Sequence, residues 1–335
     1  MEFTLVDNSQ VDWDTLDRFK DRLVYQTREW IQFVADTQRA TPVIAALQQG
    51  SKTVGYFSGL VCRRAGIRIL GSPFPGWTTP SMGFNLLPGT PRWQALQALE
   101  RFAFQELRCL HVEVSDQYSC AEDGIRLGFS CDVYDCLQTD LTPSEENIFG
   151  CLRKHCRTNI RKAEKNGVWI EEAHDEQFAD DYYDQLKDVF ARQKLVPTYD
   201  RDRTRRLIHY LLPTGRLLLL RARDSEGKCI ATGIYAAVGK TAEYWGSASF
   251  GSKLHQKPND VLCWYAIAYW KRQGIHSLSW GPRNAFKDKW ASTPIAVPWF
   301  RKSRFALIGV GRRWARGIFD LKQHLVGNLN RVLES

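Results

Sequence analysis

Several features that mark other protein classes are missing from this sequence. No apolar run approaches the ~18–20 residues that a membrane-spanning helix needs. Residues 1–14 have neither the basic segment nor the apolar segment of a signal peptide, so we expect a cytoplasmic protein. The sequence also lacks G-x-S-x-G, H-E-x-x-H and the Walker phosphate loop. It therefore gives no support to nucleophilic or metal-dependent hydrolysis.

Metal-ligand spacing is also missing. The nine cysteines are scattered and contain no C-x-x-C pair, which indicates reduced, structural thiols. His155 and Cys156 are neighbours, and on a helix they would point about 100° apart, so they cannot hold one ion together. We expect neither a metal nor another cofactor.

The composition is that of a folded and basic protein. A length of 335 residues with 44% hydrophobic residues indicates a globular chain of about two domains. The net charge of +9 favours an anionic partner: nucleic acid, a nucleotide-linked substrate or an anionic membrane surface. The charge alone is equally consistent with a basic protein that has no such partner.

The order of predicted elements repeats along the chain. The first half reads as a helix after Thr27, strands at 41–47, 52–62 and 67–70, a loop at 71–83, and a helix at 92–107 before two more strands. The pattern restarts with a helix at 142–165. We therefore predict domains at 1–140 and 141–308, followed by a basic C-terminal helix at 309–335.

The second half carries the most informative stretch. Strands at 230–238 and 241–247 form a hairpin through Gly239-Lys240, and a helix at 261–272 precedes a strand at 277–280. The loop before this helix, 252–259, has no glycine and contains Pro258. Such a loop lacks the backbone N–H groups that cradle a pyrophosphate at a helix N-terminus.

Two basic segments are candidate polyanion contacts. Residues 151–165 carry six cations and one acid, and Arg157 and Arg161 share a helix face where guanidinium groups would bind phosphate. A solvated helix face is the alternative. In the C-terminal helix the candidate nucleic-acid contacts are Arg312, Arg313 and Arg316.

Several motifs occur in one order that resembles the FemAB-like branch of the GNAT superfamily. They are the run at 153–168, Tyr244-Trp245-Gly246-Ser247, Pro258-Asn259, Leu278-Ser279-Trp280-Gly281 and Phe286-Lys287-Asp288-Lys289-Trp290. The resemblance implies an α/β fold of two GNAT-like domains, each a mixed, mostly antiparallel sheet flanked by helices. It also implies transfer of an aminoacyl group from aminoacyl-tRNA to an amine of a cell-envelope precursor, without CoA.

The family signature F-K-x-x-F-G falls on residues 286–291, where Trp290 and Ala291 replace Phe and Gly. Lys287 keeps its place and is the predicted catalytic residue, because a fixed ammonium stabilises the oxyanion formed when an amine attacks an acyl carbonyl. A surface lysine and tryptophans that only pack in the core are the alternatives. The predicted substrate-binding residues are Trp77, Thr79, Arg157, Arg161, Tyr244, Trp245, Ser247, Asn259, Trp280, Asn284 and Lys289.

The donor stays open at this stage. Fem enzymes that bind tRNA often carry a long coiled-coil insertion, and this sequence has no room for one. A CoA- or carrier-protein-dependent N-acyltransferase of exopolysaccharide or natural-product biosynthesis is one alternative. A non-catalytic basic RNA-binding protein on a GNAT scaffold is another.

Overall fold

The computed structural model describes residues 1–309 and divides into two compact units. Within these residues, unit 1 contains 1–136, 281–283 and 294–309, and unit 2 contains 137–280 and 284–293. The expected second domain, 141–308, thus differs from unit 2 at its C-terminal end. The cause is β13 (Ser292–Ser303), which pairs with β6 (His111–Ser115) of unit 1, Trp299 lying opposite Ser115. The expected helix at 309–335, with Arg312, Arg313 and Arg316, lies outside the described residues.

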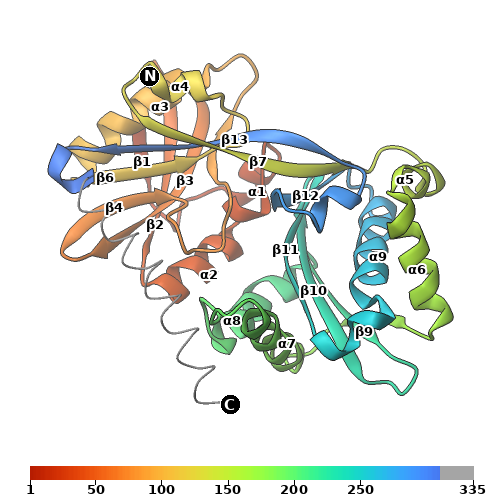
Figure 1. Ribbon diagram of the computed structural model, residues 1–335. Helices are drawn as coiled ribbons and strands as arrows, with labels where there is room; N and C mark the ends of the chain where they lie inside the picture. Colours follow the sequence, from red (N-terminus) through yellow and green to blue (C-terminus); the bar gives the residue numbers. More distant parts are fainter. Residues whose placement is uncertain (310–335) are drawn as a thin grey trace. The chain divides into compact units, whose positions relative to one another are not determined.

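Unit 1 is a mostly antiparallel sheet with helices (Figure 1). Its strands follow the order β1-β2-β3-β4-β6-β13, β5 pairs with β3, and β4 runs parallel to β6. Its further elements are β1 (Glu2–Val6), α1 (Trp13–Asp17), η1 (Val24–Gln26), α2 (Arg28–Gln38), β2 (Thr41–Gln49), β3 (Lys52–Arg64), β4 (Ile67–Ser72), β5 (Gly83–Leu86), α3 (Arg92–Arg101), η2 (Phe102–Glu106), α4 (Ala121–Ile125) and the first part of β7 (Ser130–Asp140).

Unit 2 is built on the sheet order β12-β11-β10-β9-β8, in which β11 and β12 are parallel. Helices α9 and α6 lie on one side of this sheet and α7 and α8 on the other (Figure 1). Its elements are α5 (Glu145–Cys151), α6 (Lys154–Lys165), β8 (Trp169–Ala173), α7 (Phe178–Arg192), α8 (Arg201–Leu211), η3 (Leu212–Thr214), β9 (Leu217–Arg223), β10 (Cys229–Val238), β11 (Thr241–Ser249), η4 (Gly251–Gln256), α9 (Pro258–Arg272), β12 (Ser277–Pro282) and η5 (Lys287–Lys289).

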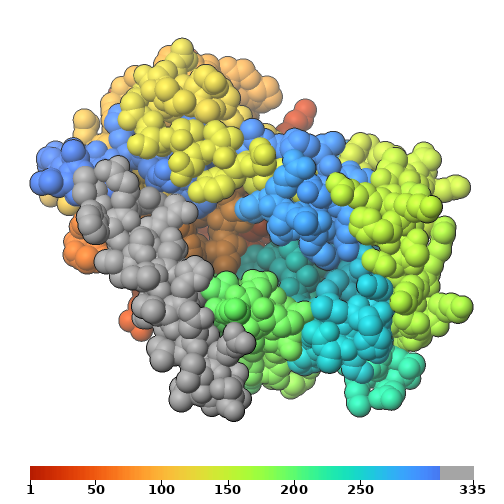
Figure 2. Space-filling model, viewed as in Figure 1, coloured from red at the N-terminus to blue at the C-terminus, as the bar shows by residue number. Residues whose placement is uncertain are grey.

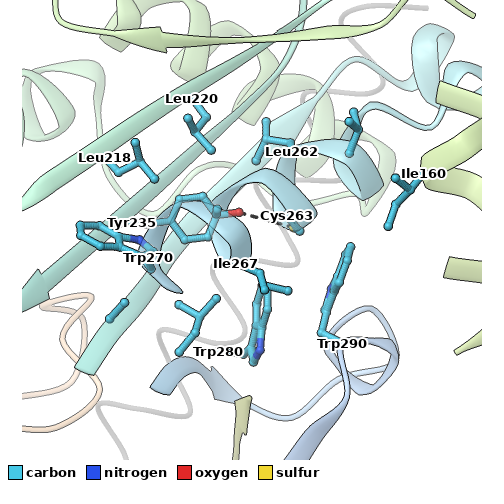
Figure 3. Close-up of a cluster of buried hydrophobic side chains, with 14 of the residues drawn as sticks. Ile160, Leu218, Leu220, Tyr235, Leu262, Cys263, Ile267, Trp270, Trp280 and Trp290 are labelled. Carbon is cyan, nitrogen blue, oxygen red and sulfur yellow. Dashed lines mark hydrogen bonds between the residues drawn. The ribbon is translucent and has the colours of Figure 1, made fainter. Parts of the chain in front are cut away.

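The core of unit 2 lies between α9 and the sheet. Leu262, Cys263 and Ile267 of α9 face Leu218 and other apolar side chains of the strands (Figure 3). Gly233 of β10 allows this close approach, because a Cβ there would collide with the side chain of Leu262. α9 is therefore a fixed element, and its first turn is held against the sheet.

The two units share one design, which confirms the expected tandem fold class. Each has a β-hairpin, then a helix, then a strand that runs parallel to the second strand of the hairpin. These elements are β3, β4, α3 and β6 in unit 1 and β10, β11, α9 and β12 in unit 2. In unit 1, β4 and β5 pair with successive parts of β3, and residues 73–82 interrupt the strand between them. Unit 2 has no such interruption within β11.

The helix expected at 142–165 is two helices. Leu152 between them is extended (φ −60°, ψ 147°) and buried, and the Arg153 N–H donates to the Lys289 carbonyl at 3.3 Å. Tertiary contacts therefore override a continuous helical pattern. The strand β13 and the 3-10 turn η5 were not among the elements predicted from the sequence. No helix within residues 1–309 is long and apolar enough to span a membrane.

Candidate active site

The strands β11 and β12 of unit 2 separate soon after they meet. They pair only where Thr241–Glu243 lie beside Ser277–Ser279, whereas β11 continues to Ser249 along β10. In the described registers, β12 therefore leaves the edge of β11 from Tyr244 onward uncovered. Strand edges of this kind offer N–H and C=O groups to an extended ligand.

A β-bulge reorients the side chains at this point. Ile234 pairs with Gly246 and Tyr235 with Tyr244, so the register shifts by one residue at Trp245. Tyr244 and Ser247 consequently lie on the α9 face, where the Tyr244 Oη and the Ser247 Oγ are 2.7 Å apart. The bulge thus places two hydroxyl groups side by side on this face, next to the part of β11 that β12 leaves uncovered.

Trp245 and Gly246 lie on the opposite face, beside α7. The Trp245 ring packs against Tyr199 and Tyr182, with centroids 5.6 and 6.2 Å away. The two tyrosine hydroxyls are 2.7 Å apart. A Cβ at Gly246 would stand 2.8 Å from the Tyr182 Oη, so the bulge requires a glycine here. Trp245 therefore lies on the other side of β11 from Tyr244, and Tyr182 and Tyr199 are neighbours that the sequence did not reveal.

The α9 face collects four of the predicted residues: Tyr244, Ser247, Asn259 and Lys287. The Lys287 Nζ lies 5.5 Å from the centroid of the Tyr244 ring, and the Asn259 Nδ2 donates to the Ser249 Oγ at 2.9 Å. The Asn259 Oδ1 is buried and accepts no hydrogen bond from any residue in 1–309. Burial raises the pKa of Tyr244 well above its ordinary value, so the phenol stays protonated and can donate.

The turn η5 fixes Lys287 in place. The Lys287 N–H lies within hydrogen-bonding distance of the Asn284 carbonyl (3.0 Å) and Oδ1 (3.1 Å), and Ser292 Oγ donates to the Lys287 carbonyl at 3.1 Å. Asn284 therefore caps this turn through its backbone and side-chain oxygens. Its side chain is exposed, and the substrate contact that the sequence suggested stays a prediction.

Lys289 is also used inside the protein. Its Nζ is 2.6 Å from the Asp260 Oδ1, with side-chain exposures of 10% and 8%, and it lies over the rings of Phe286 and Trp290. The Asn159 Nδ2 contacts the same carboxylate oxygen at 3.4 Å. Lys289 is thus a buried ion-pair partner, and the prediction that it contacts substrate is not supported by its position.

Helix α9 carries an acid, Asp260, in its first turn. A carboxylate in the first helical turn satisfies the positive end of the helix dipole. The preceding residues form the closed turn η4, whose Lys253 binds Asp224 at 2.9 Å. The loop at 252–259 offers a pyrophosphate no glycine N–H groups, and Pro258 has no N–H to donate.

Trp280 belongs to the core, which is the alternative reading of the tryptophans. It is fully buried and stacks on Trp290 with centroids 5.6 Å apart (Figure 3). Thr139 Oγ1 accepts from the Trp280 Nε1 at 2.8 Å and donates to the Trp290 carbonyl at 2.8 Å. The Trp280–Trp290 pair joins β12 to η5. Trp280 therefore packs beneath the site and has no exposed surface for a substrate to contact.

Two thiols near the Lys289–Asp260 pair are not nucleophiles. Burial raises the pKa of Cys156 and that of Cys263 to about 12, so both are protonated near pH 7. Among residues 1–309, no group of three His, Cys, Asp or Glu side chains could hold a metal ion.

The remaining predicted residues lie elsewhere. Arg157 donates to the Gly150 and Leu152 carbonyls at 2.5 and 2.6 Å and so closes the end of α5, while Arg161 lies over the Phe149 ring at 5.6 Å. In unit 1, Trp77 is fully buried, and the Thr79 Oγ1 accepts from Trp30 at 3.0 Å. Trp77 and Thr79 fold the 71–83 loop onto the core, and this corrects their assignment to substrate.

Comparison with known proteins identifies this arrangement. Residues 151–289, which contain the bulge, α9 and η5, match the acetyltransferase (GNAT) domain family. Residues 151–289 therefore form a GNAT-type domain, and the chain is an acyltransferase. No curated protein matches this acyltransferase in sequence.

Solved structures place the whole acyltransferase among tandem GNAT folds. FemX has a TM-score of 0.70 and 12% identity over 89% of this chain and 97% of that one. The C-terminal domain assigned to a lysylphosphatidylglycerol synthetase from Agrobacterium fabrum has a TM-score of 0.52 and 11% identity, covering 88% and 96%. A tandem GNAT protein from the clavulanic acid biosynthesis pathway has a TM-score of 0.51 and 11% identity, covering 90% and 98%. At these identities the likeness concerns the fold.

Proposed function

We propose that this acyltransferase moves an aminoacyl group from aminoacyl-tRNA to an amine on a polar acceptor, such as a peptide or a cell-envelope precursor. The observation that carries the proposal is the placement of Lys287 over Tyr244, beside the open edge of β11. The start of α9 supports a donor other than CoA, because the preceding loop has no glycine and Pro258 at the first helical position lacks the N–H that a phosphate would accept. The Fem resemblance and the lysylphosphatidylglycerol synthetase neighbour agree with aminoacyl transfer.

The residues suit attack of an amine on an ester carbonyl. The amine nitrogen forms the new C–N bond, the C–O bond to the ribose breaks, and the proton of the amine ends on the leaving oxygen. The Lys287 ammonium stabilises the oxyanion formed at the carbonyl, a contribution of about 3–4 kcal/mol for one well-placed donor. The Asn259 Oδ1 accepts a hydrogen bond that orients the attacking amine. The Tyr244 phenol relays the proton: it donates to the leaving oxygen and is reprotonated by the amine.

The test is a transfer assay with the full-length protein. Purified enzyme is mixed with tRNA charged with labelled amino acids and with a panel of amine acceptors, and the mass of each acceptor is followed. We expect a mass gain of one aminoacyl residue that disappears when the charged tRNA is first digested with RNase.

Two other results would replace the proposal. Transfer from acyl-CoA or an acylated carrier protein that survives RNase would establish the alternative donor. Tight tRNA binding without acyl transfer to any acceptor would favour an RNA-binding role.

A further inference from the structure

An open cavity of about 610 Å³ lies within unit 1. One side is formed by the segment after α1, with Arg18, Phe19 and Lys20, and the other by the connection from β5 to α3, with Leu86, Leu87 and Pro88. Its volume is in the range of small-molecule sites, roughly 300–1,000 Å³. It shares no residue with the β11–α9 site and has no part in the proposed acyl transfer.

The cavity carries uncompensated positive charge. Arg18 and Lys20 are exposed, and neither side chain makes an ion pair or donates a hydrogen bond within the described part of the chain. The acid that lines the cavity, Asp21, is 8% exposed and already bound by Arg92 at 2.5 Å and by the Leu86 N–H at 3.0 Å. Two cations therefore remain for a ligand.

An apolar surface faces these cations. Leu87 is 37% exposed, and Leu86 lies next to it. The Phe19 ring is held edge-on against Tyr56, with centroids 5.9 Å apart. A ligand that has both an anionic group and an apolar body would satisfy both sides.

The walls are held by a buried polar network. The Arg22 Nη1 donates to the Asn85 Oδ1 at 2.9 Å, and the Asn85 Nδ2 donates to the Gln26 Oε1 at 2.9 Å and the Asp21 carbonyl at 3.1 Å. These bonds tie the segment after α1 to β5. A preformed cavity loses little conformational freedom when a ligand binds.

We propose that this cavity binds a small organic anion. A carboxylate or phosphate group lies between Arg18 and Lys20, and an apolar body lies against Phe19, Leu86 and Leu87. The guanidinium of Arg18 offers a bidentate contact, and Lys20 adds a point charge. The first unit thus has a ligand site of its own.

Calorimetry with the full-length protein tests this with three probes that share a phenyl ring: phenyl phosphate, phenylacetate and the uncharged benzyl alcohol. We expect at least one anion to bind saturably with a dissociation constant of roughly 1 mM, and benzyl alcohol to bind more weakly. The double variant Arg18→Gln, Lys20→Gln should weaken anion binding by about tenfold or more. The relative affinities of the two anions distinguish a phosphate ligand from a carboxylate.

Arg63→Gln, Arg64→Gln is the matched control, since both arginines are exposed on the β3–β4 turn of the same unit. It should change affinity by less than about twofold. The proposal is overturned if neither anion binds saturably, if the Arg18, Lys20 variant binds as wild type does, or if benzyl alcohol binds as tightly as the anions. No acyl-transfer activity enters these measurements, so their outcome is independent of the proposed function.

Discussion

Lys287 and Lys289 are two residues apart and carry the same charge, yet their surroundings give them different roles. Lys289 is enclosed between Phe286, Trp290 and Asp260, so its ammonium group is already bound inside the protein. Lys287 is half-buried and lies over Tyr244 on the open side. Lys289 therefore contributes to folding, and Lys287 stays the predicted catalytic residue.

Lys287→Met keeps the length of the side chain and removes its charge. We expect kcat to fall by about 10²–10³ with donor binding and thermal stability nearly unchanged, because the ammonium acts on charge that develops during the reaction. The measurement is steady-state transfer together with a thermal melt. Lys228→Met, which changes a lysine that is 69% exposed, is the control. Wild-type activity in Lys287→Met would remove this lysine from the mechanism.

Lys289→Met should act on stability instead. It leaves the Asp260 carboxylate buried without its cation, and removing one partner of a buried pair costs about 3–5 kcal/mol of the free energy of unfolding. Lys289→Met combined with Asp260→Leu removes both charges and should recover most of that loss. Urea unfolding followed by tryptophan fluorescence measures all three proteins. A single variant as stable as wild type would show that the pair contributes nothing.

At the scale of elements, the bulge in β11 depends on its contact with α7. Gly246→Ala would place a Cβ 2.8 Å from the Tyr182 Oη, so we expect a loss of about 1–3 kcal/mol in stability. Tyr182→Phe removes the oxygen and gives up its bond to Tyr199. The double variant should therefore be more stable than the sum of the two single effects predicts. Additive effects in denaturant titrations would mean that α7 does not set the bulge.

A cluster of charges joins β8, β9 and α7. Arg221 is 3% exposed at its side chain and binds Glu171, Asp175 and Asp181 at 2.9, 2.7 and 2.7 Å. The hydrogen bond from Arg221 lowers the pKa of Asp175, and bonds from Arg223 and Arg221 lower that of Glu171. A carboxylate with a depressed folded pKa stabilises the fold above its unfolded pKa and stops doing so as the pH falls through the folded value.

We therefore expect the urea concentration at the unfolding midpoint to decrease as the pH is lowered from 6 to about 3. Arg221→Gln should lower the midpoint at pH 6 and make its decline with acid shallower. Midpoints that run parallel for the two proteins across this range would show that the cluster is not the source of the acid sensitivity.

Local signals predicted the elements that depend on neighbouring residues. Thr27 caps α2 as its sequence indicates, and the turn at Gly239-Lys240 joins β10 to β11. The break at Leu152 and the strand β13 escaped prediction because each depends on a distant partner, the Lys289 carbonyl in one case and β6 in the other. The residue pattern of one segment does not show which distant residues that segment will contact.

The candidate site was predictable to the same extent. The F-K signature identified Lys287, and Tyr244, Ser247 and Asn259 share its face of β11. Trp280 and Lys289 were assigned to substrate because a tryptophan or lysine in a motif looks the same in sequence whether it faces a ligand or the core. Only the stacking on Trp290 and the pairing with Asp260 separate the two cases.

At the scale of the whole molecule, the net charge of +9 is unevenly compensated. On α7 and α8, Lys187, Arg201 and Arg205 each bind an aspartate at 2.9 Å. Helix α6 lies at the surface, in yellow-green in Figure 2. Its Lys154, Lys162 and Lys165 are exposed and make no ion pair within residues 1–309. These three lysines join the exposed Arg161 as candidates for the polyanion surface that was predicted at Arg157 and Arg161.

If α6 contacts the phosphates of the RNA donor, the affinity for unfractionated tRNA should fall steeply with salt. Replacing Lys154, Lys162 and Lys165 by Gln should then reduce the slope of log K against log salt by about 2, at roughly 0.7 for each lost contact. Replacing Lys187, Arg201 and Arg205 by Gln lowers the net charge equally and should leave the slope nearly unchanged, because those cations are already neutralised by aspartates. Fluorescence anisotropy with labelled tRNA measures both slopes. Equal changes in the two triple variants would mean that tRNA responds to total charge and that α6 is an ordinary solvated surface.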